Sequence, residues 1–305
     1  MNSRFLAYSV ISARVEMEAN GLGTTFLELS STSLGEMRLP SPELSTQKSI
    51  ADYLDRETTQ IDAFIAKNEE LIALLTERRQ VTIEDALSPS AFNGAYQTCQ
   101  IRRLGPRAES GVSVNGFQEP ASEGAIGVLK TGAVSKGYFD PSENKQVVPE
   151  DLERVATPVL ANRLIVNRAN TPDLVGRAGW TESSHPNLYL SDKLWQLSFK
   201  DADPKYLHYW THSSSYREQL RSLSVGASSS MQNLSYNDFL SLRVTLPASK
   251  EQGRIAAELD LAMKQADSAI DTAHRAIELA KERRAALISA AVTGKIDVSK
   301  EASAV

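Results

Sequence analysis

The chain has 305 residues, of which 41% are hydrophobic and 23% are charged, and its formal net charge is −5. This composition excludes an intrinsically disordered chain, and the single cysteine, Cys99, excludes an internal disulfide. Because no apolar run is long enough to cross a membrane and no leader pattern opens the sequence, we expect a cytoplasmic protein with no membrane partner.

Residues 1–40 contain several short features that recur downstream in the same order. The segment Arg4–Ser12 is predicted to be a helix or a strand, and a turn is predicted at Gly21–Thr25. We interpret residues 1–40 as the last part of a repeat whose complete copy lies downstream. The alternative is a short N-terminal subdomain that is complete in itself. The matching pairs, at offsets of 201 to 207 positions, are Phe5-Leu6 with Tyr206-Leu207, Leu29-Ser30 with Leu234-Ser235, and Leu39-Pro40 with Leu246-Pro247.

A long amphipathic helix is predicted within residues 41–90. The stretch Gln47–Leu87 has no proline or glycine, and its large apolar residues recur at helical spacing. At 1.5 Å per residue this helix would be about 60 Å long. Ser45-Thr46 supplies a plausible N-cap, and Ser88-Pro89 ends the helix because proline cannot continue it. The apolar stripe consists of Ile50, Leu54, Ile61, Ile65, Ile72 and Leu75.

Residues 247–297 contain a second copy of this helix. Gln47 aligns with Gln252, an offset of 205 positions. The second helix is predicted to run from about Ser249 to Thr293, with Gly294 closing it and residues 298–305 forming a frayed tail. A single apolar stripe of this length needs a partner, so we predict that the two helices pair with each other. The downstream stripe consists of Ile255, Leu259, Ile270, Ile277 and Ile288.

Residues 95–246 are predicted to form a separate, mixed but mostly β domain, which makes the chain α+β. Helical periodicity fades there, and glycine, proline, asparagine and serine become frequent. One helix is predicted at Lys205–Leu223 and a short serine-capped helix at Leu234–Asp238. The expected strands are Ile126–Lys130, Gln146–Val148, Arg163–Asn167, Leu188–Leu190 and Leu194–Phe199.

No catalytic signature is complete in the sequence. Asp140-Pro141-Ser142 falls short of the Asp/Asn-Pro-Pro-aromatic motif of an amino-methyltransferase. Glu143-Asn144-Lys145 has the Glu-x-Lys form of metal-dependent nucleases, but no suitably spaced upstream acid accompanies it. The four histidines are scattered, so no metal site is expected. We therefore expect a binding protein without catalytic activity or a cofactor of its own, and a nuclease that uses Glu143 and Lys145 is the alternative.

Three loops of the central domain carry side chains that suit a polyanion. The net charge argues against simple nucleic-acid binding, but Arg154–Thr181 contains four arginines and only one acid. Arginine and lysine can neutralise phosphates, and amides and hydroxyls can read base edges. Each loop taken alone is equally consistent with an ordinary turn. The candidate DNA-binding residues are Lys130, Thr131, Lys136, Tyr138, Arg168, Asn170, Thr171, Arg177, Ser228, Ser229, Ser230, Gln232 and Asn233.

The duplicated helix motif resembles the specificity subunit of type I restriction-modification systems. The motif joins Leu-Pro, Gln, Ile-Ala and Leu-Asp at the start of each helix to Glu-Arg-Arg near its end. Residues 167–177 and 226–235 are also similar to recurrent recognition-domain segments of this family. The resemblance covers nearly the whole chain. The residues that carry it are Leu39-Pro40, Gln47, Ile50-Ala51, Leu54-Asp55 and Glu77-Arg78-Arg79, with Leu246-Pro247, Gln252, Ile255-Ala256, Leu259-Asp260 and Glu282-Arg283-Arg284.

The resemblance implies target-recognition domains that are each followed by a conserved long helix, with the two helices packed antiparallel as an intramolecular coiled coil. Residues 95–246 would be a complete recognition domain, and residues 1–40 the C-terminal remnant of a truncated first one. The chain would be a non-catalytic subunit that reads one half of a split site on double-stranded DNA. It would dock with two modification (methyltransferase) subunits and with restriction/translocation subunits, and S-adenosylmethionine, ATP and Mg are expected in those partners. A self-paired dimer of half-size subunits and a coiled-coil adaptor without DNA binding are the alternatives.

Overall fold

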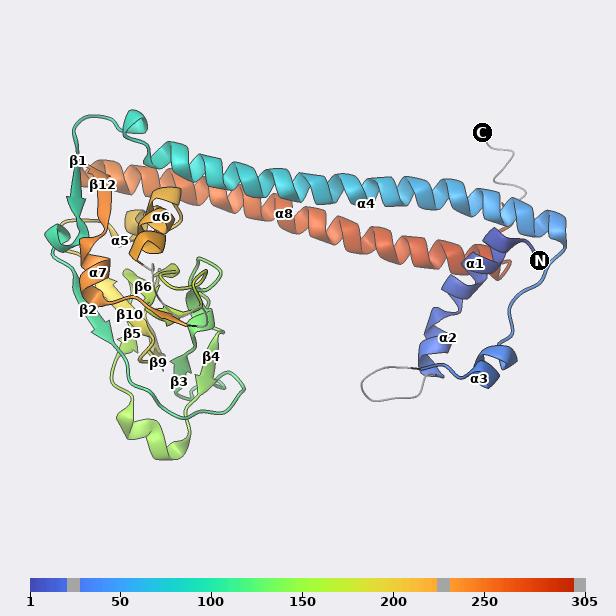
Figure 1. Cartoon of the computed structure of the whole chain (residues 1–305), viewed down its shortest axis with the longest axis horizontal. Helices are drawn as coiled ribbons and strands as arrows, with labels where there is room; N and C mark the ends of the chain where they lie inside the picture. Colours follow the sequence, from blue (N-terminus) through green and yellow to red (C-terminus); the bar gives the residue numbers. More distant parts are fainter. Residues whose placement is uncertain (21–27, 224–230, 299–305) are drawn as a thin grey trace. The chain divides into compact units, whose positions relative to one another are not determined.

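The computed structural model divides the chain into two compact units, each with a hydrophobic core of its own. Unit 1 comprises residues 1–76 and 266–305, and unit 2 comprises residues 77–265. The structure describes residues 1–20, 28–223 and 231–298. Two long helices, α4 (Leu44–Leu87) and α8 (Ser249–Val292), contribute to both units (Figure 1). The predicted α+β class is confirmed.

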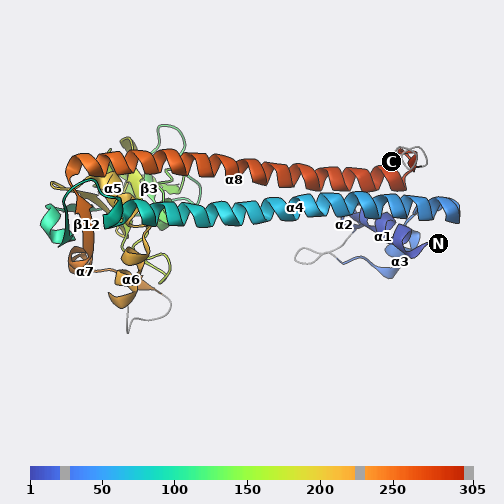
Figure 2. The same ribbon diagram turned by 90° about the horizontal axis from the view of Figure 1, so that it is seen from above.

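Unit 1 is helical. Its core joins the first N-terminal helix to the first part of α4 and the last part of α8, and the side chain of Phe5 is completely buried there. In this unit α4 and α8 run antiparallel, and Arg284 Nε donates to Asp62 Oδ1 at 2.9 Å (Figure 2). The short helices are α1 (Ser3–Ser12), α2 (Arg14–Ala19) and α3 (Ser31–Glu36). The core residues are Phe5, Ile50, Ala51, Tyr53, Leu54, Ile288, Ala291, Val292 and Val298.

The long helices begin and end close to the predicted positions. Helix α4 begins at Leu44, one residue before the predicted cap, and α8 begins at Ser249 as predicted. Gly294 follows α8 with a φ of 74°, the left-handed conformation that a glycine adopts after a helix. Of the predicted stripe residues, Ile65, Ile72, Leu75 and Ile270 are half-buried. The other stripe residues are buried, namely Ile50, Leu54, Ile61, Ile255, Leu259, Ile277 and Ile288.

Unit 2 is built on an antiparallel sheet of four strands. Its largest core packs one side of this sheet against helices α5 (Pro204–Trp210), α6 (Ser214–Leu223) and α7 (Tyr236–Ser241). Tyr206 and Tyr216 are among the fully buried side chains of this core, and burial of such a large side chain contributes about 1.5–3 kcal/mol. In spatial order the strands are β2 (Arg107–Ser110), β10 (Leu194–Ser198), β6 (Arg163–Asn167) and β8 (Ala178–Thr181).

Three smaller sheets complete the described strands of unit 2. A second four-stranded sheet contains, in order, β4 (Asn144–Gln146), β3 (Gly127–Leu129), β9 (His185–Tyr189) and β5 (Pro158–Val159), and its β3–β9 pair is parallel. The two-stranded sheets are β1 (Tyr96–Gln100) with β12 (Arg243–Pro247) and β7 (Ala169–Asn170) with β11 (Gln232–Asn233). The 3-10 helices are η1 (Pro89–Ala91), η2 (Ile101–Leu104), η3 (Thr131–Val134) and η4 (Pro149–Arg154).

The prediction of a single helix over Lys205–Leu223 is wrong, because the chain breaks between α5 and α6. The hydroxyls of Thr211 and Ser213 donate to main-chain carbonyls three residues upstream, at 2.6 and 2.8 Å. Ser213 Oγ also accepts from Tyr216 N at 3.2 Å, which caps the second helix. The predicted strand at Arg163–Asn167 is confirmed as β6, and the predicted serine cap before the short helix is confirmed at Ser235.

The duplication extends to the hydrogen bonds at the start of each long helix. In unit 1, Gln47 Oε1 accepts from Asn2 N at 2.7 Å, and Gln47 Nε2 donates to Pro42 O at 2.7 Å. In unit 2, Gln252 Oε1 accepts from Asp203 N at 2.9 Å, and Gln252 Nε2 donates to Pro247 O at 2.9 Å. Each glutamine therefore fastens the helix in front of it, α1 or α5, to the strand or segment that leads into the long helix.

A second pair of contacts repeats about two turns further along each long helix. Tyr8 donates its hydroxyl to Asp55 Oδ1 at 2.8 Å, and Tyr209 donates to Asp260 Oδ1 at 2.6 Å. The same carboxylates form ion pairs with a basic residue of the preceding helix, Arg4 in unit 1 and Lys205 in unit 2. The two copies thus share a buried glutamine and a tyrosine–aspartate–cation contact, which we call the junction of each unit.

Candidate nucleic-acid interface

The candidate residues on two of the predicted loops lie together on the short β7–β11 ladder. Asn170 pairs with Gln232, and Ala169 pairs with Asn233. Leu234 N donates to Arg168 O at 2.7 Å, so the ladder continues past β7 toward β6. The fold therefore brings the predicted residue Asn170 next to the predicted residue Gln232, which lies 62 positions downstream. The predicted Ser228, Ser229 and Ser230 lie outside the described residues.

Arg168 lies over an aromatic platform. Its guanidinium carbon is 5.5 Å from the centroid of the Trp195 ring, within the range of a cation–π contact. The Trp195 ring is itself held by Tyr236 and Phe239, whose ring centroids are 5.6 and 6.1 Å away. Among the described residues, Arg168 Nε is a buried donor without a hydrogen-bond partner. A buried donor in a fixed orientation is suited to receive an acceptor from a ligand.

The loop from Thr171 to Arg177 is held by its own main chain and by α6. Gly176 N donates to Asn167 O at 2.7 Å, and Asn167 N donates to Arg177 O at 2.8 Å. Gly176 has a φ of 74°, and a Cβ there would lie 2.3 Å from Leu220 Cδ1. Only glycine fits this turn, because both the left-handed backbone and the contact with α6 exclude a side chain. The loop therefore presents Arg177 from a rigid support.

Helix α6 adds positive charge beside this loop. Arg217 donates to Val175 O at 3.0 Å and to Asp173 O at 2.8 Å, which fastens the loop to the helix. Burial lowers the pKa of Arg217, and the positive charges of Arg177 and Arg221 lower it further. Mutual repulsion of three arginines marks a locally electropositive surface. The sequence prediction missed Arg217 and Arg221, although their i, i+4 spacing on a predicted helix was a visible signal.

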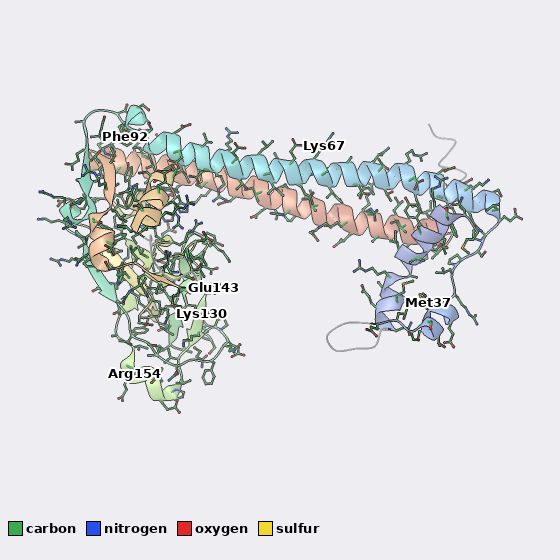
Figure 3. The ribbon with its side chains drawn as sticks, viewed as in Figure 1. Met37, Lys67, Phe92, Lys130, Glu143 and Arg154 are labelled. Atoms are coloured by element: carbon green, nitrogen blue, oxygen red, sulfur yellow. The ribbon has the colours of Figure 1, made fainter. Side chains whose placement is uncertain are left out.

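The predicted DNA-binding residues Lys130 and Lys136, on the remaining predicted loop, are paired with acids. Lys130 Nζ lies 3.8 Å from Glu143 Oε2 (Figure 3). Lys136 Nζ lies 3.4 Å from Asp140 Oδ2 and 5.8 Å from the centroid of the exposed Tyr138 ring. Because each ammonium has a carboxylate partner, this loop contributes less net positive charge than the Arg177 loop. Thr131 begins the 3-10 helix η3 directly after Lys130.

His212 connects the Lys136 loop to the Arg177 region. Its Nε2 lies 2.8 Å from Gly137 O, and a carbonyl only accepts, so Nε2 carries the proton. Burial lowers the pKa of His212 to about 4, with smaller lowering effects from Arg177 and Arg79. The imidazole is therefore neutral near pH 7 and acts as a structural donor. Gly179 adds a second contact, since a Cβ there would lie 2.5 Å from Phe139 N.

The residues of the nuclease alternative have separate partners. Lys145 Nζ donates to Val114 O at 2.7 Å, whereas Glu143 faces Lys130. Within the described residues, no group of three histidine, cysteine, aspartate or glutamate side chains is placed to hold a metal ion. None of the described helices is both long and apolar enough to span a membrane. The arrangement offers hydrogen-bond donors, amides and positive charge, and it is suited to binding.

No family model matches the chain. Its sequence is 24% identical to the Type I restriction enzyme EcoKI specificity subunit of Escherichia coli (strain K12), over 96% of this chain and 66% of that protein. It is 23% identical to the Type I restriction enzyme EcoBI specificity subunit of Escherichia coli, over 97% of this chain and 66% of that protein. The chain thus spans slightly less than two thirds of the length of these curated relatives.

The fold is also similar to solved structures. A structure solved for complex assembly and conformational transition of the type I R-M system matches with a TM-score of 0.71 at 14% identity, over 94% of this chain and 70% of that chain. The HsdS subunit from Thermoanaerobacter tengcongensis matches with a TM-score of 0.54 at 14% identity, over 97% of this chain and 71% of that one. The chain is thus similar in sequence, along nearly its whole length, to type I restriction enzyme specificity subunits, and it shares the fold of these solved structures.

Proposed function

We propose that the chain is a DNA sequence-recognition subunit of a type I restriction-modification complex, and that unit 2 binds one half of a bipartite DNA target. The observation that carries this proposal is the grouping of Arg168, Asn170 and Gln232 on the β7–β11 ladder, beside the Arg177 loop. In this proposal the chain recognises DNA and positions it, and the partner subunits carry out the chemical reactions. It acts where the DNA is, in the cytoplasm.

The groups on the ladder are those that distinguish bases. A guanidinium can donate twice to guanine, and an Asn or Gln amide can both donate to and accept from adenine. Gln232 Oε1 is a buried acceptor without a partner among the described residues, like the donor Arg168 Nε. We assign base reading to Arg168, Asn170 and Gln232. We assign phosphate binding to Arg177, Arg217 and Arg221, because their positive charges lie close enough together to affect one another.

Unit 1 supplies a surface for the modification subunits. Ile61, Phe64, Ala276, Leu279 and Ala280 line a groove of about 450 Å³ between α4 and α8. Phe64 and Leu279 are exposed there, although both are large and apolar. An apolar groove between two helices suits a third helix. We propose that two modification subunits, which supply S-adenosylmethionine-dependent methylation, dock on this chain, and that restriction/translocation subunits with ATP and Mg join them.

The test of DNA binding is fluorescence anisotropy with a labelled duplex of mixed sequence at two salt concentrations. Wild-type affinity should fall steeply with salt, because cations on the protein displace counterions from DNA. Arg177→Ala should weaken binding to all sequences and reduce the slope of log affinity against log salt by about one. The matched control is Arg254→Ala, which removes the same charge from a residue paired with Glu251 and Glu258 on α8. Equal slopes for wild type and Arg177→Ala would refute the assignment.

Base reading needs the target sequence. Mapping of methylated adenines in cells that carry the complete system would supply it. On that target, Arg168→Ala should cost about 1–3 kcal/mol of binding free energy while mixed-sequence affinity changes less. An equal loss on target and mixed DNA would assign Arg168 to phosphate instead. Absence of any DNA binding, alone or with modification subunits, would favour the coiled-coil adaptor.

A further inference from the structure

The paired strands β1 and β12 carry a second group of polar and basic side chains, on the part of unit 2 that leads into α8 (Figure 1). Gln100 pairs with Arg243, and two positions away along the ladder Thr98 pairs with Thr245. Because cross-strand partners point to the same side and alternate residues share a face, these four side chains lie on one face of the ladder. The hydroxyl oxygens of Thr98 and Thr245 are 2.9 Å apart on that face.

The 3-10 helix η2 brings a second arginine to the same place. Ile101 and Leu104 are buried and anchor η2, whereas Arg103 between them is exposed. Leu104 O accepts from Lys200 N at 3.0 Å and from Asp201 N at 3.2 Å, which fastens the end of η2 to the segment after β10. Arg103 therefore lies on a fixed support.

Arg103 and Arg243 line a pocket of about 720 Å³, which we call the β1–β12 pocket. Neither guanidinium forms an ion pair or a hydrogen bond with any of the described residues. Burial raises the pKa of the Cys99 thiol in the pocket wall, and the positive charges of Arg103 and Arg243 lower it, so both charges act on one point of that wall. The described lining holds these two cations and one acid, Asp201, which leaves it net positive. Its other polar side chains are Gln97, Thr98 and Gln100.

Helix α6 connects the β1–β12 pocket to the Arg177 loop. Gln219 Nε2 donates to Arg243 O at 2.9 Å, and Gln219 Oε1 accepts from Arg243 N at 2.7 Å. On the same helix, Arg217 donates to the main-chain carbonyls of the loop. The pocket is thus held in a fixed position relative to the arginines that the proposed function assigns to DNA phosphates.

We propose that the β1–β12 pocket binds phosphate groups of the DNA backbone, as a second phosphate site apart from the β7–β11 ladder. This inference rests on the proposed function, because it takes duplex DNA as the ligand of unit 2. Two guanidinium groups without carboxylate partners are suited to phosphate oxygens, and the neighbouring amides and hydroxyl add donors. No aromatic side chain is among the described residues of the lining, so the pocket wall offers a free nucleotide no ring on which to stack its base. The site therefore adds affinity for DNA that does not depend on base sequence.

The first test is fluorescence anisotropy of the full chain with a labelled mixed-sequence duplex over a range of salt concentrations. Arg103→Gln combined with Arg243→Gln should reduce the slope of log affinity against log salt by about two, because each lost phosphate contact lowers it by about one. Arg103→Lys combined with Arg243→Lys keeps both charges and should retain the wild-type slope. The matched control is Lys264→Gln combined with Arg275→Gln, which removes the same charge from exposed positions of α8. All of these side chains are exposed, so the midpoint of urea unfolding should be unchanged.

The single cysteine of the chain then locates the contact. Cys99 is half-buried in the wall of the β1–β12 pocket, so its rate of alkylation by iodoacetate reports access to that wall. Saturating duplex DNA should slow the alkylation of the wild-type chain. Inorganic phosphate and ATP, each at the same concentration of phosphate groups, are separate arms and should not slow it.

Three results would overturn the inference. The first is an unchanged salt slope after Arg103→Gln with Arg243→Gln, or an equal reduction by the control pair on α8. The second is alkylation of Cys99 that duplex DNA does not slow. The third is protection of Cys99 by ATP or inorganic phosphate to the same extent as by the duplex, which would assign the pocket to a free anion.

This inference and the proposed function fail in different ways. A salt slope that falls with Arg177→Ala, but not with loss of Arg103 and Arg243, keeps the proposed interface and removes the phosphate site in the β1–β12 pocket. A slope that falls with loss of Arg103 and Arg243, but not with Arg177→Ala, keeps the pocket and removes the proposed interface.

Discussion

Replacement of Gln252 by leucine tests the unit 2 junction most directly. The side chain is 3% exposed and joins two main-chain groups, Asp203 N–H and Pro247 C=O. Leucine has similar volume but leaves both groups without partners. An unsatisfied buried donor or acceptor costs about 1–3 kcal/mol, so Gln252→Leu should lower the free energy of unfolding by about 3 kcal/mol.

The assay exploits the position of the tryptophans. All three, Trp180, Trp195 and Trp210, belong to unit 2, so their fluorescence reports the unfolding of that unit. With a urea m-value of about 3 kcal/mol per molar, the loss moves the midpoint of unfolding down by about 1 M. The comparison variant is Gln47→Leu, which breaks the same two bonds in unit 1 and should leave the tryptophan midpoint nearly unchanged. Equal shifts for both variants, or no shift for Gln252→Leu, would refute the reasoning.

Three further predictions concern the Arg177 loop, the buried His212 and the groove of unit 1. Gly176→Ala forces a Cβ toward Leu220 at a positive φ, so it should cost about 1–3 kcal/mol of stability in a urea titration and weaken DNA binding; an unchanged midpoint would contradict the rigid loop. The pKa of His212 is about 4 when folded against 6.5 unfolded, so stability of about 3 kcal/mol is present above pH 6.5 and is lost as the pH falls toward 4; His212→Gln should flatten that part of a stability profile measured by urea midpoints, and an unchanged slope would contradict the burial. Leu279→Asp should reduce co-purification with modification subunits at least tenfold while Leu261→Asp does not, and equal recovery would exclude the groove as their docking surface.

The elements that could be predicted from the sequence are those with local signals. The stripes from Ile50 and from Ile255 have helical spacing within one segment, and the capping serine before α7 acts three residues away. The break at residues 211–213 was missed because the apolar pattern continues through it. The hydroxyl bonds of Thr211 and Ser213 occur at the break, and residue spacing does not reveal them.

The arrangement of the candidate site could not be predicted in this way, because its residues are distant in the sequence. Arg168, Asn170 and Gln232 were predicted from residue type alone, but their meeting depends on a ladder of two residues on each side. Such a short ladder has no periodic pattern, so its register could not be read in advance. The spacing of Arg217 and Arg221 indicates a charged helix face, but it does not reveal that Arg217 donates to main-chain carbonyls of the Arg177 loop.

A continuous series of contacts connects the junction of unit 2 to the candidate interface. Gln252 and Asp260 fix α5 on α8, and Lys205 of α5 lies 4.3 Å from the ring centroid of Trp180 on β8. Strand β8 pairs with β6, and these two strands begin and end the segment that contains the Arg177 loop. Discrimination between bases requires side chains held within a fraction of an ångström, and rigid elements achieve this better than free loops. The same pair of glutamine bonds repeats at the two junctions, so each junction fixes a helix against the segment that leads into its long helix.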